Sequence, residues 1–142
     1  MYFRKQYEFS VYILTNHEKT VLYVGMTNNL PDRLAEHYFN RGQRKTFAGR
    51  YYCYNLVYYD QFQYGRDAIA REKELKGWIR EKKISLINST NPTWIFLNKK
   101  VCIHWPPKEK PKRFYDGRTE MLRVRIILLI KSLAQHDKTP RM

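Results

Sequence analysis

Glu72 is the carboxylate whose position in this chain most suggests chemistry. It lies in the segment AIAREKELKGWI, and on a helix it shares one face with Ala68, Leu75 and Ile79. A carboxylate beside apolar side chains needs a cation or a hydrogen-bond donor next to it. A hard metal ion such as Mg²⁺ needs only one or two protein carboxylates and could supply that charge. An ion pair with a nearby Lys or Arg would satisfy Glu72 equally well, and this segment alone favours the ion pair.

Arg33 and His37 are four residues apart, so on a helix their side chains are neighbours. Arginine presents a planar fork of donors that fits a phosphate, and histidine can transfer a proton near neutral pH. A solvated arginine beside a half-buried histidine would give the same spacing. The pair therefore permits phosphate chemistry without establishing it.

Tyr12 and Tyr23 each lie in the middle of a β-rich run. A tyrosine hydroxyl has an ordinary pKa near 10, so it acts as a base only where nearby cations lower that pKa. The chain has 12 tyrosines, and most strand tyrosines pack in cores. Core packing is therefore the simpler interpretation of either residue taken alone.

The elements that would position these side chains can be read from the apolar patterns. Residues 11–14 and 21–24 predict two strands of a β-hairpin, joined by the polar segment TNHEKT. Residues 28–38 predict a helix, with Asn29 as its cap, Pro31 in its first turn, and Leu30, Leu34 and His37 along one face.

The next part of the chain predicts one more strand and two more helices. Residues 40–49 are basic and polar and predict an exposed loop, and residues 56–62 predict the third strand. Helices are expected over residues 67–79 and 81–88. The expected order is β-β-α-β-α-α, which is an α+β fold with a three-stranded antiparallel sheet flanked by helices.

Composition divides the rest of the chain. We expect a domain over residues 8–98, a basic, proline-containing linker over 99–118, and an amphipathic C-terminal helical extension over 119–136. The extension could pack on the domain or make the protein a homo-oligomer, through the apolar side chains Leu122, Ile126, Leu129 and Leu133.

The net charge of +14, from 27 basic and 13 acidic residues, favours a polyanionic partner. Nucleic acid is the first candidate and an anionic membrane surface the second. Cys53 and Cys102 have no paired spacing, which predicts reduced thiols in a cytoplasmic protein. No apolar run is long enough to cross a bilayer, and the N-terminal residues do not resemble a signal peptide.

The ordered set of motifs resembles the GIY-YIG nuclease family. It comprises VYIL, LYVGMTN, RLAEH and AREKELKGW, which contain Tyr12, Tyr23, Arg33, His37 and Glu72. Small, single-domain bacterial members of the family are the most similar. The resemblance covers about two-thirds of the chain, and as an ordered set it is specific although each tripeptide alone is not.

The resemblance implies a divalent-metal-dependent endonuclease that hydrolyses DNA phosphodiester bonds. Glu72 would bind Mg²⁺ or Mn²⁺, and Arg33 would bind the scissile phosphate. Tyr12 would orient or deprotonate the attacking water, helped by His37 or Tyr23. Asn98 is the further site residue that the resemblance implies, with Asn91 as a competitor.

DNA is the expected partner, although RNA is not excluded, and in a bacterium the protein would be associated with the nucleoid. The expected nucleic-acid contacts are Gly25, where the backbone could approach closely, and the basic side chains Arg33, Arg41, Arg44, Lys45 and Lys76. Two alternatives remain: a catalytically weak module with the same fold that binds nucleic acid, and a protein whose basic tail binds membrane. The sequence does not distinguish single-stranded, duplex and branched substrates.

Overall fold

A computed structural model describes residues 9–112 of the chain. The predicted C-terminal extension and residues 113–118 of the predicted linker therefore lie outside the described residues. In chain order, the strands and helices are β1 (Phe9–Thr15), β2 (Leu22–Thr27), α1 (Leu30–Phe39), α2 (Phe47–Arg50), β3 (Asn55–Phe62), α3 (Gly65–Gly77), α4 (Arg80–Thr90) and α5 (Asn98–Val101).

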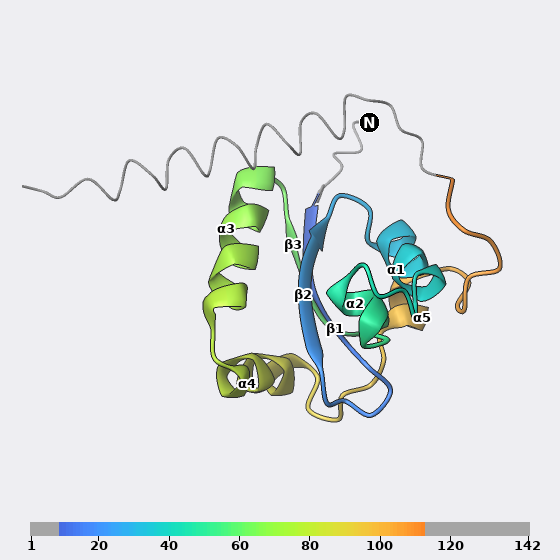
Figure 1. Ribbon diagram of the computed structural model, residues 1–142. Coiled ribbons are helices and arrows are strands. Elements are labelled where there is room, and N and C mark those ends of the chain that lie inside the picture. The colour runs from blue at the N-terminus through green and yellow to red at the C-terminus, as the bar shows by residue number, and fades with distance from the viewer. Residues whose placement is uncertain (1–8, 113–142) are drawn as a thin grey trace, which may run out of the picture. The chain divides into compact units, whose positions relative to one another are not determined.

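The three strands form one antiparallel sheet in the order β2-β1-β3. Helices α3 and α4 lie on one side of it, and α1, α2 and α5 lie on the other (Figure 1). β1 is the central strand and is covered on both faces, which explains why its sequence is apolar at successive positions rather than at alternate ones. The predicted α+β fold with a three-stranded antiparallel sheet is confirmed.

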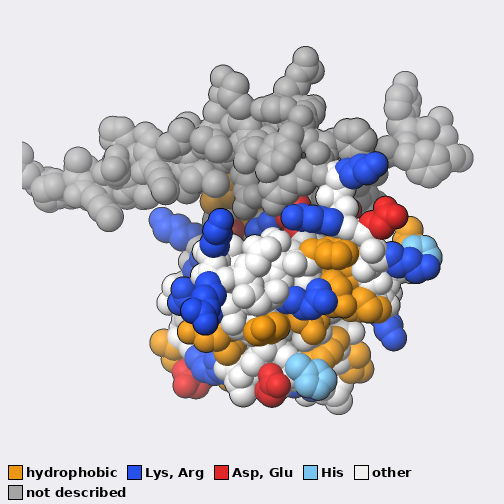
Figure 2. All heavy atoms as spheres, turned by 45° about the vertical axis from the view of Figure 1, so that its right-hand side comes forward, with side chains coloured by type: hydrophobic (Ala, Val, Ile, Leu, Met, Phe, Trp, Pro, Cys, Tyr) orange, Lys and Arg blue, Asp and Glu red, His pale blue; other side chains and the backbone are white. Residues whose placement is uncertain are grey.

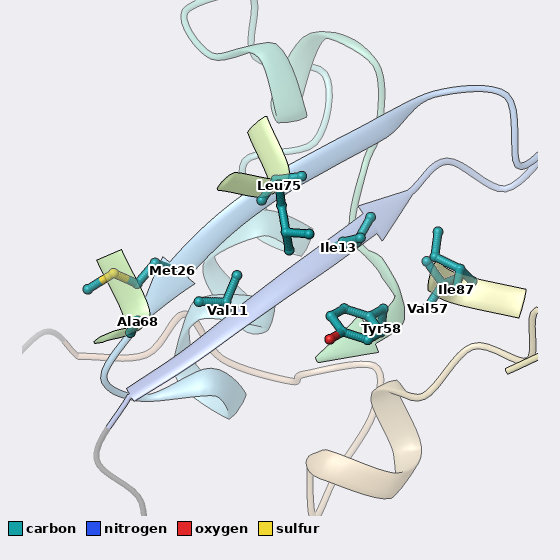
Figure 3. Packing of buried hydrophobic residues seen from close by; sticks show 9 residues of the cluster. Val11, Ile13, Met26, Val57, Tyr58, Ala68, Leu75 and Ile87 are labelled. Carbon is teal, nitrogen blue, oxygen red and sulfur yellow. The ribbon is translucent and has the colours of Figure 1, made fainter. Parts of the chain in front are cut away.

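Alternate residues of β1 belong to two separate cores. Val11 and Ile13 pack with Leu75 and other residues of α3 and α4 (Figure 3), whereas Tyr12 and Leu14 pack toward α1. The register between β1 and β3 shifts at one point, because Ile13 pairs with Tyr58 whereas Leu14 pairs with Leu56. The extra residue there is a β-bulge, and as a result Val57 and Tyr58 both face the core under α3 and α4.

Helix α1 begins as its sequence predicts. The Asn29 side chain accepts a hydrogen bond from the backbone N–H of Asp32 at 3.2 Å and so caps the helix. Leu30, Leu34 and His37 are all buried, as their shared face predicts.

Two sequence-based expectations were wrong in detail. Residues 40–49 are not only loop, because Phe47–Arg50 forms a turn of helix, capped by the Thr46 hydroxyl, that buries Ala48. Ile79 does not share the buried face of Ala68 and Leu75, because α3 ends at Gly77 and Ile79 becomes the exposed residue that precedes α4.

The chain continues along the domain beyond the predicted boundary at residue 98. The short helix α5 follows directly, Cys102 is buried, and Trp105 packs edge-on against Tyr38 of α1. Among the described residues, no helix is long and apolar enough to cross a membrane.

Candidate active site

Tyr12 lies at the centre of the polar cluster between the sheet and α1. Its side chain is fully buried, and its partner across the sheet is Gly25 of β2. The Tyr12 ring lies directly over Gly25, because a Cβ atom built on Gly25 would overlap the Tyr12 hydroxyl and come within 2.5 Å of the ring carbon Cζ. Glycine at this position therefore makes room for the ring, which is a local packing requirement for the YVG motif.

Helix α1 supplies the hydrogen-bond partners of Tyr12 from successive turns. The Tyr12 hydroxyl lies 2.9 Å from His37 Nε2, and Arg33 Nε donates to the same hydroxyl at 3.4 Å. The two α1 residues can reach one group because side chains four residues apart lie one above the other on a helix. The structure thus joins three of the predicted site residues in one hydrogen-bonded chain.

Burial and charge determine the protonation states of these three hydrogen-bonded side chains. Burial and, to a smaller extent, the nearby Arg33 cation lower the pKa of His37 from 6.5 to about 3, so His37 is neutral at neutral pH. Burial also raises the pKa of Tyr12 above its ordinary value, against the opposing effect of Arg33. All three groups are satisfied when Arg33 donates to the Tyr12 oxygen and Tyr12 donates to Nε2, which places the His37 proton on Nδ1.

Arg33 is held by a second internal partner. One of its terminal nitrogens donates to Glu36 Oε2 at 2.6 Å, and the pKa of Arg33 is raised by Tyr12 and Glu36 despite burial. The Arg33 side chain remains 23% exposed. A guanidinium fixed at two points, with an open edge, is suited to bind an oxyanion arriving from solvent.

Tyr23 lies between the buried hydrogen-bonded side chains and the surface. Its ring centroid lies 6.4 Å from that of Tyr12, 5.3 Å from that of His37 and 6.4 Å from that of Phe47. Tyr23 is only partly buried, whereas Tyr12 is inaccessible to solvent. Of the two tyrosines, only Tyr23 is therefore reached by water in this arrangement.

Glu72 lies on α3, and its carboxylate acts on the cluster through its charge. It is one of the groups that raise the pKa of Tyr12, although burial contributes most. Its side chain is 24% exposed, and Oε1 accepts from Lys76 Nζ at 2.8 Å. The structure therefore records the ion pair that the helix sequence favoured.

Glu72 supplies one carboxylate that a divalent cation could use. Within residues 9–112 no group of three or more His, Cys, Asp or Glu side chains could hold a metal ion. Mg²⁺ does not need such a cage, since it keeps several of its waters and is held by one or two carboxylates together with substrate phosphate. The Glu72 side chain is 24% exposed, and within residues 9–112 it forms an ion pair with Lys76, an exposed residue of the same helix.

A family model described as the GIY-YIG catalytic domain matches residues 8–85, which is more than half of the chain. The chain belongs to the GIY-YIG family. It is thereby placed in a family of nucleases, and the matched residues include the whole Tyr12 cluster and Glu72.

Two relatives illustrate this membership. A UPF0213 protein of Clostridium perfringens is 37% identical over 79 residues, covering 56% of this chain and 82% of the relative. A UPF0213 protein of Staphylococcus haemolyticus is 34% identical over 77 residues, covering 54% of this chain and 90% of the relative. Their names state no activity. No solved structure matches the chain significantly.

Asn98 of this GIY-YIG protein lies apart from the Tyr12 chain. It is buried beside the start of β3, where Oδ1 accepts from the Leu56 N–H at 2.8 Å and Nδ2 donates to the Tyr54 carbonyl at 2.8 Å. Asn91, the alternative site residue, also binds backbone, because its side-chain amide donates to the Val57 and Ile95 carbonyls. Both asparagines bind backbone in this structure.

The predicted phosphate-contacting cations of this GIY-YIG domain are distributed over two sides of the sheet. Arg41, Arg44 and Lys45 are exposed between α1 and α2, where the Arg41 guanidinium lies 4.0 Å from the centre of the Tyr38 ring. Lys76 is on α3 and pairs with Glu72. The first group is on the same side of the sheet as Arg33.

Two residues of the site were not predicted. Glu36 was missed because a carboxylate three residues after an arginine on a helix is most often a surface ion pair. Phe47 was missed because it lies in a segment predicted as a polar loop. The RLAEH sequence does contain a signal for Glu36, since its spacing from Arg33 allows the pair.

Proposed function

We propose that this chain is an endonuclease that hydrolyses DNA phosphodiester bonds with Mg²⁺ or Mn²⁺. The observation that carries the proposal is the hydrogen-bonded chain of Arg33, Tyr12 and His37 beside the solvent-accessible Tyr23. A buried phenol and imidazole beside a partly buried guanidinium stabilise a fold less than apolar packing of the same volume would, which favours a functional reason for the arrangement.

Arg33 binds the scissile phosphate with its exposed edge and neutralises the charge that develops on it during cleavage. Its two internal partners, Tyr12 and Glu36, fix the direction of the guanidinium before substrate arrives. Phosphoryl transfer depends mainly on such positioning and charge neutralisation, so a preset guanidinium lowers the barrier without reorganising.

Tyr12 and Tyr23 have different roles in this proposal. Tyr12 has no access to water and a raised pKa, so it is a positioning residue that orients Arg33 and His37. Tyr23 is at the boundary with solvent, and its hydroxyl is the one suited to orient the attacking water. This assignment moves the water-contacting role from Tyr12 to Tyr23 because of burial alone.

Glu72 is the residue that would hold the divalent ion, after exchanging Lys76 for it. A bound divalent ion would neutralise charge on the phosphate and on the leaving oxygen. The negative charge of Glu72 is the smallest of the effects that shift the pKa of Tyr12, which supports a place for the carboxylate near this centre.

The second candidate function is a module that binds nucleic acid and cleaves it weakly or not at all. The ion pair between Glu72 and Lys76 is the observation that favours it, because Lys76 occupies the carboxylate oxygen that a metal would need. The same basic surface would serve both functions.

A cleavage panel separates the two candidates. The full chain is incubated with end-labelled single-stranded, duplex and branched DNA in Mg²⁺, in Mn²⁺ and in EDTA. Metal-dependent products on at least one substrate are expected. Tight binding with no cleavage of any substrate would contradict the endonuclease and favour the binding module.

A further inference from the structure

Residues 41–52, RGQRKTFAGRYY, combine features that the catalytic proposal does not use. This segment holds four cations, Arg41, Arg44, Lys45 and Arg50, and no carboxylate. The same segment contains three large aromatic side chains, Phe47, Tyr51 and Tyr52, and all three are exposed. Large aromatic side chains usually bury most of their surface, so three exposed ones within six residues call for an explanation.

The rings continue outward from the candidate active site. The Phe47 ring lies nearly parallel to that of Tyr23, with 21° between their planes, and its centroid is 4.8 Å from that of Tyr51. Phe47 is 50% exposed and Tyr51 is 42% exposed. We call Tyr23, Phe47 and Tyr51 the aromatic row. It begins at the ring that contacts His37 and ends at the surface.

The local fold holds this row in place. The Thr46 hydroxyl caps α2, and Ala48 is buried, so the helix is anchored by its small residues and presents Phe47 outward. Gly49 has no room for a side chain, because a Cβ atom there would lie 2.6 Å from the Gln43 carbonyl oxygen. Tyr52 has a positive φ of 57°, an unusual conformation for a bulky residue. The row is therefore part of a defined structure.

The charges near the row favour a polyanion. Figure 2 shows the side of the molecule on which α1 and α2 lie, with hydrophobic and basic side chains interleaved and few acidic ones. Exposed aromatic rings among cations are the pattern by which proteins bind single strands, since bases stack on the rings while the backbone phosphates contact the cations. In a duplex the bases are stacked on each other, so their faces are closed to such rings.

We propose that the aromatic row is a base-stacking subsite that binds unpaired nucleobases of single-stranded DNA, next to the phosphate bound by Arg33. The inference rests on the proposed function in that it names the substrate class of the same centre. Phe47 and Tyr51 stack on the bases, and Arg41, Arg44 and Lys45 follow the phosphates.

Binding measured in EDTA tests the subsite without cleavage. Fluorescence anisotropy compares a labelled oligothymidylate with a blunt duplex of the same length, for the wild-type chain and for a double variant with Phe47→Leu and Tyr51→Leu. Leucine keeps apolar bulk and removes the ring. We expect the double variant to lose about tenfold or more in affinity for the single strand, with duplex affinity unchanged.

Matched variants guard against a general effect of losing a ring. Tyr64→Leu removes an exposed aromatic from the residue that precedes α3, outside the row, and should leave both affinities unchanged. Tyr51→Phe keeps the ring and should retain single-strand affinity. Tyr51→Leu alone, at the outer end of the row, gives the same comparison if the double variant does not fold.

The outcomes separate this inference from the proposed function. Equal affinity of wild type and double variant for the single strand, or equal losses on both DNA forms, overturns the subsite whether or not the chain cleaves DNA. The selective loss supports the subsite even if no substrate is cleaved, in which case only the endonuclease proposal fails.

Discussion

At the scale of single residues, the site depends on polar side chains that lie away from solvent and form hydrogen bonds with each other. Tyr12, His37 and Arg33 would each destabilise an apolar interior alone, but together they satisfy their hydrogen bonds. Removing the Tyr12 hydroxyl takes away the hydrogen bond of the buried His37 Nε2, whereas Arg33 keeps its bond to Glu36 and some contact with solvent. Substitutions in this cluster therefore affect stability and activity together, and the measurements must separate the two.

Tyr12→Phe removes only the hydroxyl of the buried tyrosine. We expect the variant to fold, to lose about 1–3 kcal/mol of stability because His37 and Arg33 each lose a partner, and to cleave DNA more slowly while binding it normally. Tyr23→Phe, at the boundary with solvent, should lower the rate with little change in stability. Denaturant unfolding and single-turnover cleavage measure the two effects. A Tyr12→Phe variant with wild-type stability would contradict the hydrogen-bonded chain.

His37 makes the stability of the fold sensitive to acid. Its pKa is 6.5 ordinarily and about 3 in the folded chain, so between these values the unfolded state binds more protons. Stability should therefore fall as the pH falls from about 6.5 toward about 3, and His37 should have no effect above that window. His37→Gln keeps an acceptor and does not titrate. Its unfolding midpoint should change less over the window than that of wild type, and parallel curves would contradict the shift.

The sequence predicts which residues form the cluster but not how deeply they are buried or how burial shifts their pKa values. Tyr12, Arg33 and His37 were found through the ordered motifs, and helical spacing alone already paired the last two. The burial that raises the pKa of Tyr12 depends on how the sheet, Gly25 and α1 meet. No pattern along the chain reports that close approach.

At the scale of elements, the long periodic segments were predicted well and the short ones were not. The three strands, α1 and α3 bury apolar residues that form visible patterns in the sequence, whereas Ile87 is the one buried residue of α4. Helices α2 and α5 are four residues long, too short to show a period, and they exist because of tertiary contacts. The β-bulge beside Ile13 is likewise set by packing on two faces.

Asn98 joins α5 to the start of β3, and this contact predicts a structural effect. Asn98→Ala removes the partners of two backbone groups, the Leu56 N–H and the Tyr54 carbonyl, which should cost about 2–4 kcal/mol of stability. Below its melting temperature the variant should cleave at the wild-type rate. Asn88→Ala, which loses a solvent-exposed hydrogen bond from the ring N–H of the partly buried Trp94, is the control. A stable but inactive Asn98→Ala variant would instead support the catalytic role that the family resemblance implied.

At the scale of the whole molecule, the charge of +14 should dominate affinity for DNA. Each phosphate neutralised by a cation such as Arg41, Arg44 or Lys45 releases a counterion. If about six phosphates are contacted, affinity should fall roughly a thousandfold between about 50 and 200 mM salt. A salt titration by anisotropy measures the slope, and a flat titration would contradict an electrostatic interface.

The charge also explains why the two candidate functions would use one surface. Binding and cleavage both need the cations, so affinity for DNA does not distinguish an endonuclease from a binding module. Glu72 is the residue that separates the two candidates, because a negative side chain adds nothing to binding a polyanion and is required to hold a divalent ion.

The cleavage rate of Glu72→Ala, compared with that of Glu74→Ala, is the measurement that tests the central claim most directly. Both residues are carboxylates on α3 and both pair with a cation, Glu72 with Lys76 and Glu74 with Arg71. We predict that Glu72→Ala loses about a thousandfold or more in Mg²⁺-dependent cleavage while its folding and DNA affinity are retained, and that Glu74→Ala cleaves like wild type. Wild-type cleavage by Glu72→Ala, or equal losses in the two variants, would contradict the account.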